Sequence, residues 1–245
     1  MSKIKKFGNI ILFLTFVIIL YAGHSSAGIF DDILRNLQLP EQSTTDTDTT
    51  VAGLKEALTI GTGNAVSAVS KIDGYFKNEA IKILLPENIQ NIANILSKIG
   101  YQKEVDEFIL SMNRAAEKAT PKAKDIFISA IKEMTFDDAR KILTGGETSA
   151  TDYFKSKTFN KLYESFKPII SNSMNEVGTT KAYKNMMNKY TSMSPFFGME
   201  SIDLDHYVTK KALDGLFYML ALEEKKIRTD PSARVTELLR KVFGR

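Results

Sequence analysis

The stretch Leu110–Ala119, "LSMNRAAEKA", decides the fold, because apolar residues recur through and before it at helical spacing. The pattern predicts an amphipathic helix with one broad apolar face. The small alanine side chains on this face favour a second helix packed close against it. The face consists of Val105, Phe108, Ile109, Met112, Ala115, Ala116 and Ala119.

A strip of polar side chains lies beside this apolar face. It comprises Asp106, Asn113, Arg114 and Glu117. In a structural interpretation, Glu117 pairs with Arg114, and Asn113 bonds the backbone of a neighbouring helix or loop. In a functional interpretation, the strip lines a polar ligand cleft. The alanines on the same helix indicate close helix packing and therefore favour the structural interpretation.

Capping signals mark the ends of further helices along the chain. Thr120 followed by Pro121 is typical of an N-cap with proline at the first helical position. Thr135 with Asp138 resembles a capping box, although aspartate replaces the usual Glu or Gln. A long helix is predicted from about Leu204 to Arg228.

Together, these segments predict a single all-α domain over residues 51–245. At most one short extended segment or β-ribbon is expected, near residues 79–86, where the stretch "EAIKILLP" ends at Pro86. A chain of about two hundred residues can bury one hydrophobic core without disulfide support.

The N-terminus has the layout of a secretory signal peptide over residues 1–27. Three lysines precede the apolar run Ile10–Leu20, and small residues precede a cleavage point after Ala27. The run is shorter than the ~20 residues of a spanning helix. We therefore expect cleavage and a periplasmic protein without a stable membrane span; an uncleaved anchor is the alternative. Residues 28–50 are expected to form a flexible linker, because Glu41–Thr50 contains no apolar residue.

Charge and cysteine content exclude several classes of function. Removal of the signal would take away three lysines and leave 30 basic residues against 29 acidic ones. The strongly basic surface that nucleic-acid binding requires is then missing, so we predict no nucleic-acid partner. The chain contains no cysteine, which excludes disulfides, thiolate metal sites and thiol catalysis.

Metal and enzyme chemistry find little support in the sequence. His206, the only histidine after the signal, lies near Asp203 and Asp205, but the spacing fits neither a calcium loop nor a zinc site. An N-cap role for one of the acids explains them without metal, so we predict no metal and no cofactor. A serine triad would lack the Gly-x-Ser-x-Gly motif. The alternative that stays open is a carboxylate-dependent envelope hydrolase acting on glycan.

A run of mixed charges, Glu223–Arg228, lies near the end of the long helix. Such a run is typical of a solvated face with helix-spaced charge pairs. In a second interpretation, Arg228 and Asp230, around the "TDP" turn, lock the last helix of the chain onto the domain. Neither interpretation assigns a catalytic role.

Methionine and phenylalanine side chains cluster in and around one predicted loop, from Met186 to Met199. Flexible thioethers and exposed aromatic rings suit contact with a lipid, a peptide or a protein, and core packing is an equal alternative. The sequence thus favours an exported cell-envelope protein that is a non-catalytic binding or scaffold module for an apolar ligand, a peptide or a protein partner. The candidate contact residues are Met186, Met187, Met193, Phe196, Phe197 and Met199.

Several short motifs occur in a fixed order along the chain. They are "GLKEAL" near Leu54, "DGYF" at Asp73, "ILLPE" at Leu84, "MNRAAE" at Met112, "YVTKKALDGLF" at Tyr207, "EEKKIRTDPSAR" at Glu223 and "LLRKVFG" before Arg245. Motifs in this order resemble those of a bacterial family known as domain of unknown function 4197. The resemblance covers roughly Val51 to Gly244 and implies an exported, mostly helical, single-domain protein. It implies no activity, substrate or catalytic residue.

Overall fold

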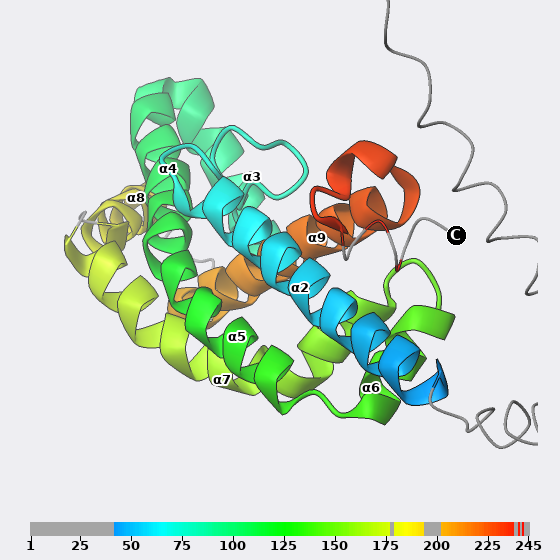
Figure 1. Cartoon of the computed structure of the whole chain (residues 1–245). Helices are drawn as coiled ribbons and strands as arrows, with labels where there is room; N and C mark the ends of the chain where they lie inside the picture. The colour runs from blue at the N-terminus through cyan, green and yellow to red at the C-terminus, as the bar shows by residue number, and fades with distance from the viewer. Residues whose placement is uncertain (1–41, 177–178, 194–201, 238–239, 241, 243–245) are drawn as a thin grey trace, which may run out of the picture. The chain divides into compact units, whose positions relative to one another are not determined.

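The computed structural model describes residues 42–176, 179–193, 202–237, 240 and 242 of the 245-residue chain. The chain divides into two compact units, Met1–Asp46 and Thr47–Arg245. The described residues form helices and connecting loops without a strand, which confirms the prediction of an all-α fold (Figure 1). The helices are α2 (Gln42–Ser70), α3 (Glu87–Leu96), α4 (Gln102–Ala119), α5 (Ala123–Glu133), α6 (Phe136–Thr144), α7 (Ser149–Glu176), α8 (Thr179–Met193) and α9 (Leu204–Thr229).

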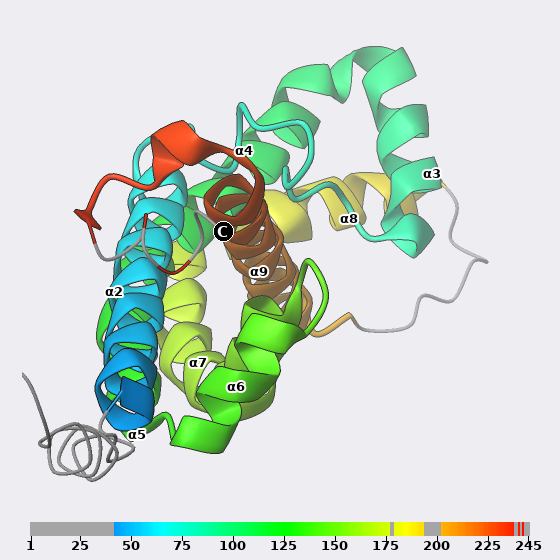
Figure 2. The ribbon, with the colours of Figure 1, turned by 45° about the vertical axis from the view of Figure 1, so that its right-hand side comes forward.

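Helix α4 carries the stretch "LSMNRAAEKA" and packs against several of the other helices. It contacts α7, α8 and α9, and α7 in turn lies along α9 and against α5 and α6 (Figures 1 and 2). The predicted apolar face is buried, except that Ile109 is only half-buried. Aromatic side chains fill the space around it: the ring of Phe108 lies 5.6 Å from that of Tyr183, and the rings of Phe127 and Phe154 lie 5.1 Å apart. The periodicity of α4 therefore predicted its buried side correctly.

The N-terminal helix begins earlier than the sequence predicted. Residues 28–50 were expected to form a flexible linker, but Gln42–Thr50 belong to α2, and residues 28–41 lie outside the described part. A polar segment can extend a helix that already exists, because adding a residue costs far less than nucleating a new turn. The predicted signal peptide, residues 1–27, also lies outside the described part. Among the described helices, none is long and apolar enough to span a membrane.

Of the N-caps predicted at Thr120 and Thr135, the one at Thr135 is confirmed and the one at Thr120 is wrong. The hydroxyl of Thr135 accepts a hydrogen bond from the Asp138 N–H, and the Asp138 carboxylate accepts one from the Thr135 N–H, each at 3.1 Å. Thr120, in contrast, is fully buried and donates its hydroxyl backwards to the Ala116 carbonyl at 2.8 Å. It continues α4 into the 3-10 turn Thr120–Lys122, and its own N–H also donates to the Ala116 carbonyl, as in an uninterrupted helix.

Residues 71–86 connect α2 to α3 without forming a helix or a strand. The short extended segment allowed near residues 79–86 is thus present only as residues 82–86, which run irregularly into Pro86 before α3. Tyr75 anchors this connection to α9: its ring is buried and its hydroxyl donates to the Ala212 carbonyl at 2.7 Å. Burial also raises the pKa of the Tyr75 hydroxyl, which therefore stays a donor.

Tyr75 can lie this close to the backbone of α9 because residue 215 is glycine. A Cβ placed on Gly215 would lie 2.7 Å from Cε1 of Tyr75 and 3.1 Å from Cβ of Ile81. Gly63, in α2, has no heavy atom within 4 Å of such a Cβ. The two helical glycines therefore differ in packing, although both lower helix propensity.

We predict that Gly215→Ala destabilises the protein, since overpacking a core costs about 1–3 kcal/mol and outweighs the helix-propensity gain. Gly63→Ala is the matched control and should raise the free energy of unfolding by about 0.5–1 kcal/mol. Urea denaturation followed by circular dichroism measures both. Equal stabilisation by the two substitutions would contradict the close contact between Gly215 and Tyr75.

Candidate functional site

The side-chain amide of Asn113 binds the connection between α2 and α3. It is fully buried, and its Oδ1 accepts a hydrogen bond from the Ile83 N–H at 2.8 Å. Its Nδ2 donates to the Ile83 carbonyl at 2.9 Å and to the Ile109 carbonyl at 2.8 Å. The amide thus pairs with both backbone groups of Ile83, as a neighbouring strand would. Asn113 therefore replaces the missing β partner of this segment.

Glu117, one turn further along α4, holds the earlier part of the same connection. Its side chain is buried at 4% exposure, and Oε1 accepts hydrogen bonds from the N–H groups of Tyr75 and Phe76, at 3.1 and 3.2 Å. Its other oxygen, Oε2, accepts one from the Arg114 guanidinium at 2.6 Å. The three donors replace the hydrogen bonds to water that the carboxylate loses on burial.

Arg114 joins this group to the end of α2. Besides Glu117, it contacts Oδ1 of Asp73 at 2.6 Å, and Lys77 contacts the other Asp73 oxygen at 2.8 Å. The hydrogen bonds from Lys77 and then Arg114 hold the pKa of the Asp73 carboxyl below its usual value. Asp73 has a φ of 67°, in the left-handed region that aspartate tolerates better than most residues. These contacts fix the turn that follows α2.

The polar strip of α4 is therefore divided. Asn113, Arg114 and Glu117 act together and satisfy the backbone of residues 75–83, whereas Asp106 is exposed and accepts a hydrogen bond from Gln102 at 2.8 Å. The contacts are those of the structural interpretation, and they leave Asn113 and Glu117 no accessible group for a ligand. Asn113, Arg114 and Glu117 thus position the backbone around them, and none of the three lines the two hollows described below.

A second buried glutamate, Glu224 in α9, was not recognised from the sequence. Its oxygens accept hydrogen bonds from the N–H groups of Ala150 and Thr151, both at 2.9 Å, and Arg228 contacts it at 2.8 Å. The interpretation of Glu223–Arg228 as a solvated face is thus wrong for Glu224 and Arg228. Glu224 satisfies free N–H groups at the start of α7, where a negative charge is also favoured by the helix dipole.

The surroundings of His206 are accounted for by helix capping and packing. Asp203 is the N-cap of α9, as one of the two sequence alternatives proposed, and accepts a hydrogen bond from the His206 N–H at 2.8 Å. The hydrogen bond from His206, with the charge of Lys167, lowers the pKa of Asp203. The imidazole Nδ1 lies 2.7 Å from the Tyr163 hydroxyl. Within the described residues, no three His, Cys, Asp or Glu side chains gather as metal ligands.

The predicted methionine and phenylalanine cluster is only partly described. Phe196, Phe197 and Met199 lie outside the described residues. Met186, Met187 and Met193 belong to α8 and not to a loop, because helical structure continues to Met193. Met187 is half-buried and packs against the core, as the core-packing alternative for this cluster expected.

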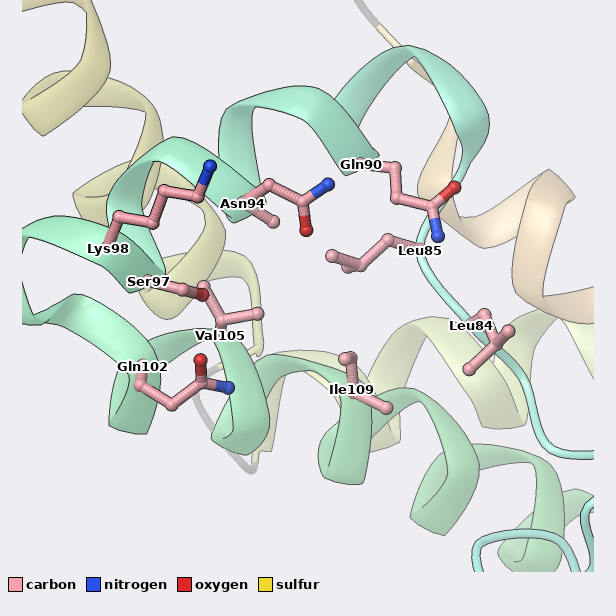
Figure 3. A pocket seen from close by; sticks show the side chains of 10 residues that line it. Leu84, Leu85, Gln90, Asn94, Ser97, Lys98, Gln102, Val105 and Ile109 are labelled. Atoms are coloured by element: carbon pink, nitrogen blue, oxygen red, sulfur yellow. The ribbon is translucent and has the colours of Figure 1, made fainter.

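A groove that the sequence did not indicate lies between α3, α4 and residues 84–85 (Figure 3). It consists of two adjoining hollows of about 410 and 570 Å³, which share Leu84, Leu85 and Gln90. Lining the first are Leu84, Leu85, Gln90, Ala93, Asn94, Ser97, Lys98, Gln102, Val105 and Ile109. The second is lined by Leu84, Leu85, Glu87, Asn88, Gln90, Tyr207 and Lys211.

The lining of this groove combines apolar and hydrogen-bonding side chains. Val105 and Ile109 extend from α4 on one side of the first hollow, the amides of Gln90 and Asn94 extend from α3 on the other, and Leu85 points between them from the segment before α3 (Figure 3). The surface therefore offers contact area for an apolar side chain together with donors and acceptors for peptide groups. Its position depends on the polar strip, because Asn113 holds Ile83, the residue directly before Leu84.

Comparison with known proteins gives a family but no activity. Residues 44–244 match the family described as "Protein of unknown function (DUF4197)". Neither the search of curated proteins nor the search of solved structures found a match.

We predict that Asn113→Ala lowers the free energy of unfolding by about 1–3 kcal/mol, because the N–H and carbonyl of Ile83 lose their partner inside the protein. Asn91→Ala, at an exposed position of α3, is the control and should leave stability nearly unchanged. Urea denaturation of both variants measures the difference. Unchanged stability of the Asn113 variant would show that the amide is not part of the fold.

Proposed function

Since the chain belongs to the DUF4197 family of unknown function, its role has to be inferred from its own residues, and we propose that it is an exported, non-catalytic module that binds a peptide segment of a partner protein. The segment lies in the groove beside Leu84 and Leu85. The observation that carries the proposal is the mixed lining of this groove. Leucine, valine and isoleucine side chains line it together with the amides of Gln90, Asn94 and Gln102.

The mixed lining favours a peptide over a lipid. An acyl chain gains most from an enclosed, uniformly apolar pocket, whereas this groove is open and carries the amides of Gln90, Asn94 and Gln102. Each amide can donate to a peptide carbonyl and accept from a peptide N–H. A peptide would leave these groups hydrogen-bonded, whereas a lipid chain would desolvate them without replacement.

The carboxylates of the described residues support binding more than catalysis. Glycoside hydrolysis needs two carboxyl groups on either side of the scissile bond. The groove is lined by one carboxylate, Glu87. The buried glutamates, Glu117 and Glu224, are committed to backbone N–H groups and arginines. For these reasons we prefer a binding module to a carboxylate-dependent glycan hydrolase.

Location in the cell envelope rests on the N-terminal sequence, with its lysines, apolar run and small residues before Gly28. We predict that the protein recovered from the envelope fraction of its own bacterium begins at Gly28. N-terminal sequencing or intact mass spectrometry measures this directly. A chain that still begins at Met1 or Ser2 would indicate an uncleaved anchor, and recovery from the cytosol would contradict export.

The binding proposal is tested with two synthetic octapeptide libraries, one attached through the amino end and the other through the carboxyl end. We predict that peptides selected on the wild-type protein bind Leu84→Gln about three- to tenfold more weakly, because covering the exposed half of a leucine side chain contributes about 0.7–1.5 kcal/mol. Leu84 is 51% exposed, so the substitution should leave the fold intact. Fluorescence polarisation of the resynthesised peptides measures the affinities.

Ile95→Gln is the matched control, because Ile95 lies on α3 with a similar exposure of 46% but lines neither hollow. Its peptide affinities should equal those of the wild type. The absence of any binding peptide, or equal losses in both variants, would show that the groove is not a peptide site.

A further inference from the structure

We infer that the groove receives the free carboxyl terminus of its partner, with the terminal carboxylate at Lys98 and the last side chain, an apolar one, against Leu85, Val105 and Ile109. This inference rests on the proposed peptide-binding function and specifies which part of a peptide the groove binds. Three features of the described residues support it: the shape of the groove, the unpaired charge of Lys98 and the adjacent apolar surface.

The first feature is that one end of the groove lies at the turn that joins α3 to α4, where Ser97, Lys98 and Gln102 line it. In this turn, Ser97–Tyr101, the backbone leaves helical geometry at Ile99 and passes through Gly100 with a φ of 98°. This left-handed conformation suits glycine and lets α4 run back beside α3. A peptide that enters beside Leu84 and follows the groove meets this turn. It therefore has to end there or leave the surface.

The second feature is the positive charge of Lys98 at this end of the groove, next to the turn between α3 and α4. Lys98 lines the hollow there, together with Ser97 and Gln102. Among the described residues, Lys98 forms no ion pair, whereas Lys103, on the next helix, lies 3.7 Å from Glu107. A positive charge at the point where a peptide ends selects its carboxyl end, since an amino terminus would be repelled.

Two neighbouring groups complete this end of the groove. The Ser97 hydroxyl is a possible second donor to a carboxylate. Gln102 already donates one amide hydrogen to Asp106 at 2.8 Å, and its amide carries a second hydrogen. Asp106 itself is not among the residues that line the hollow. At the opposite end, Glu87 and Lys211 offer both signs of charge and select no particular terminus.

The third feature is the apolar surface next to Lys98. Val105 and Leu85 are buried and Ile109 is half-buried, and all three line the same hollow as Lys98 (Figure 3). The last side chain of a peptide extends from the carbon atom that bears the terminal carboxylate. A carboxylate at Lys98 therefore places that side chain over these three residues, where an apolar group removes most surface from water.

The test uses the peptides selected from the library with free carboxyl ends, each resynthesised as a free acid and as a carboxyl-terminal amide. We expect amidation to weaken binding to the wild-type protein about tenfold, by fluorescence polarisation at low salt. The loss should decrease as ionic strength rises, because salt screens a partly exposed charge pair. Binding peptides should come from this library and not from the one attached through the carboxyl end.

Lys98→Gln should lose most of the preference for the acid form, with the amide affinity unchanged from the wild type. Lys98→Arg keeps the charge and should keep most of the preference for the acid, and Lys103→Gln is the control that should retain all of it. Equal wild-type affinities for the acid and the amide forms would overturn the carboxyl-terminal assignment. If Leu84→Gln still reduced both affinities, the groove would remain a peptide-binding site. If neither library contains a binding peptide, the assignment and the groove both fail.

Discussion

The pairing of the Asn113 amide with the backbone of Ile83 is the interaction on which the rest of the structure depends. Residues 71–86 form neither a helix nor a strand, yet their polar backbone groups lie against a hydrophobic core and must find partners there. Asn113 and Glu117, on one face of α4, supply these partners for Ile83 and for Tyr75 and Phe76. Because Ile83 is fixed, Leu84 and Leu85 follow in a defined position and form one wall of the groove.

Glu224 accepts hydrogen bonds from backbone N–H groups at the start of α7, just as Glu117 accepts them from the connection after α2. Each glutamate accepts hydrogen bonds from two consecutive backbone N–H groups and contacts an arginine on its own helix. Removing one partner of such a buried pair leaves an uncompensated charge inside the protein. Both polar clusters are thereby explained by folding, whereas the groove carries side-chain groups that are available to a partner.

The sequence predicted those features that depend on neighbouring residues and missed those that depend on distant ones. The buried face of α4 and the capping box of Thr135 follow from spacings of three and four residues, and both are confirmed. Glu224 looked like part of a solvated run because its backbone partners lie more than seventy residues earlier in the chain. The groove was missed for the same reason: helical periodicity shows which side chains α3 and α4 bury, but not how far the two helices diverge after Gly100.

Amide hydrogen exchange, residue by residue in the native protein, tests most directly whether α4 holds this irregular connection in place. The account predicts that the N–H groups of Ile83, Tyr75 and Phe76 exchange as slowly as those in the middle of α4, because buried side chains accept all three. Exchange of Ile83 at the rate of an exposed loop would contradict it. In that case Asn113 would not hold the segment, and the wall of the groove would have no fixed position.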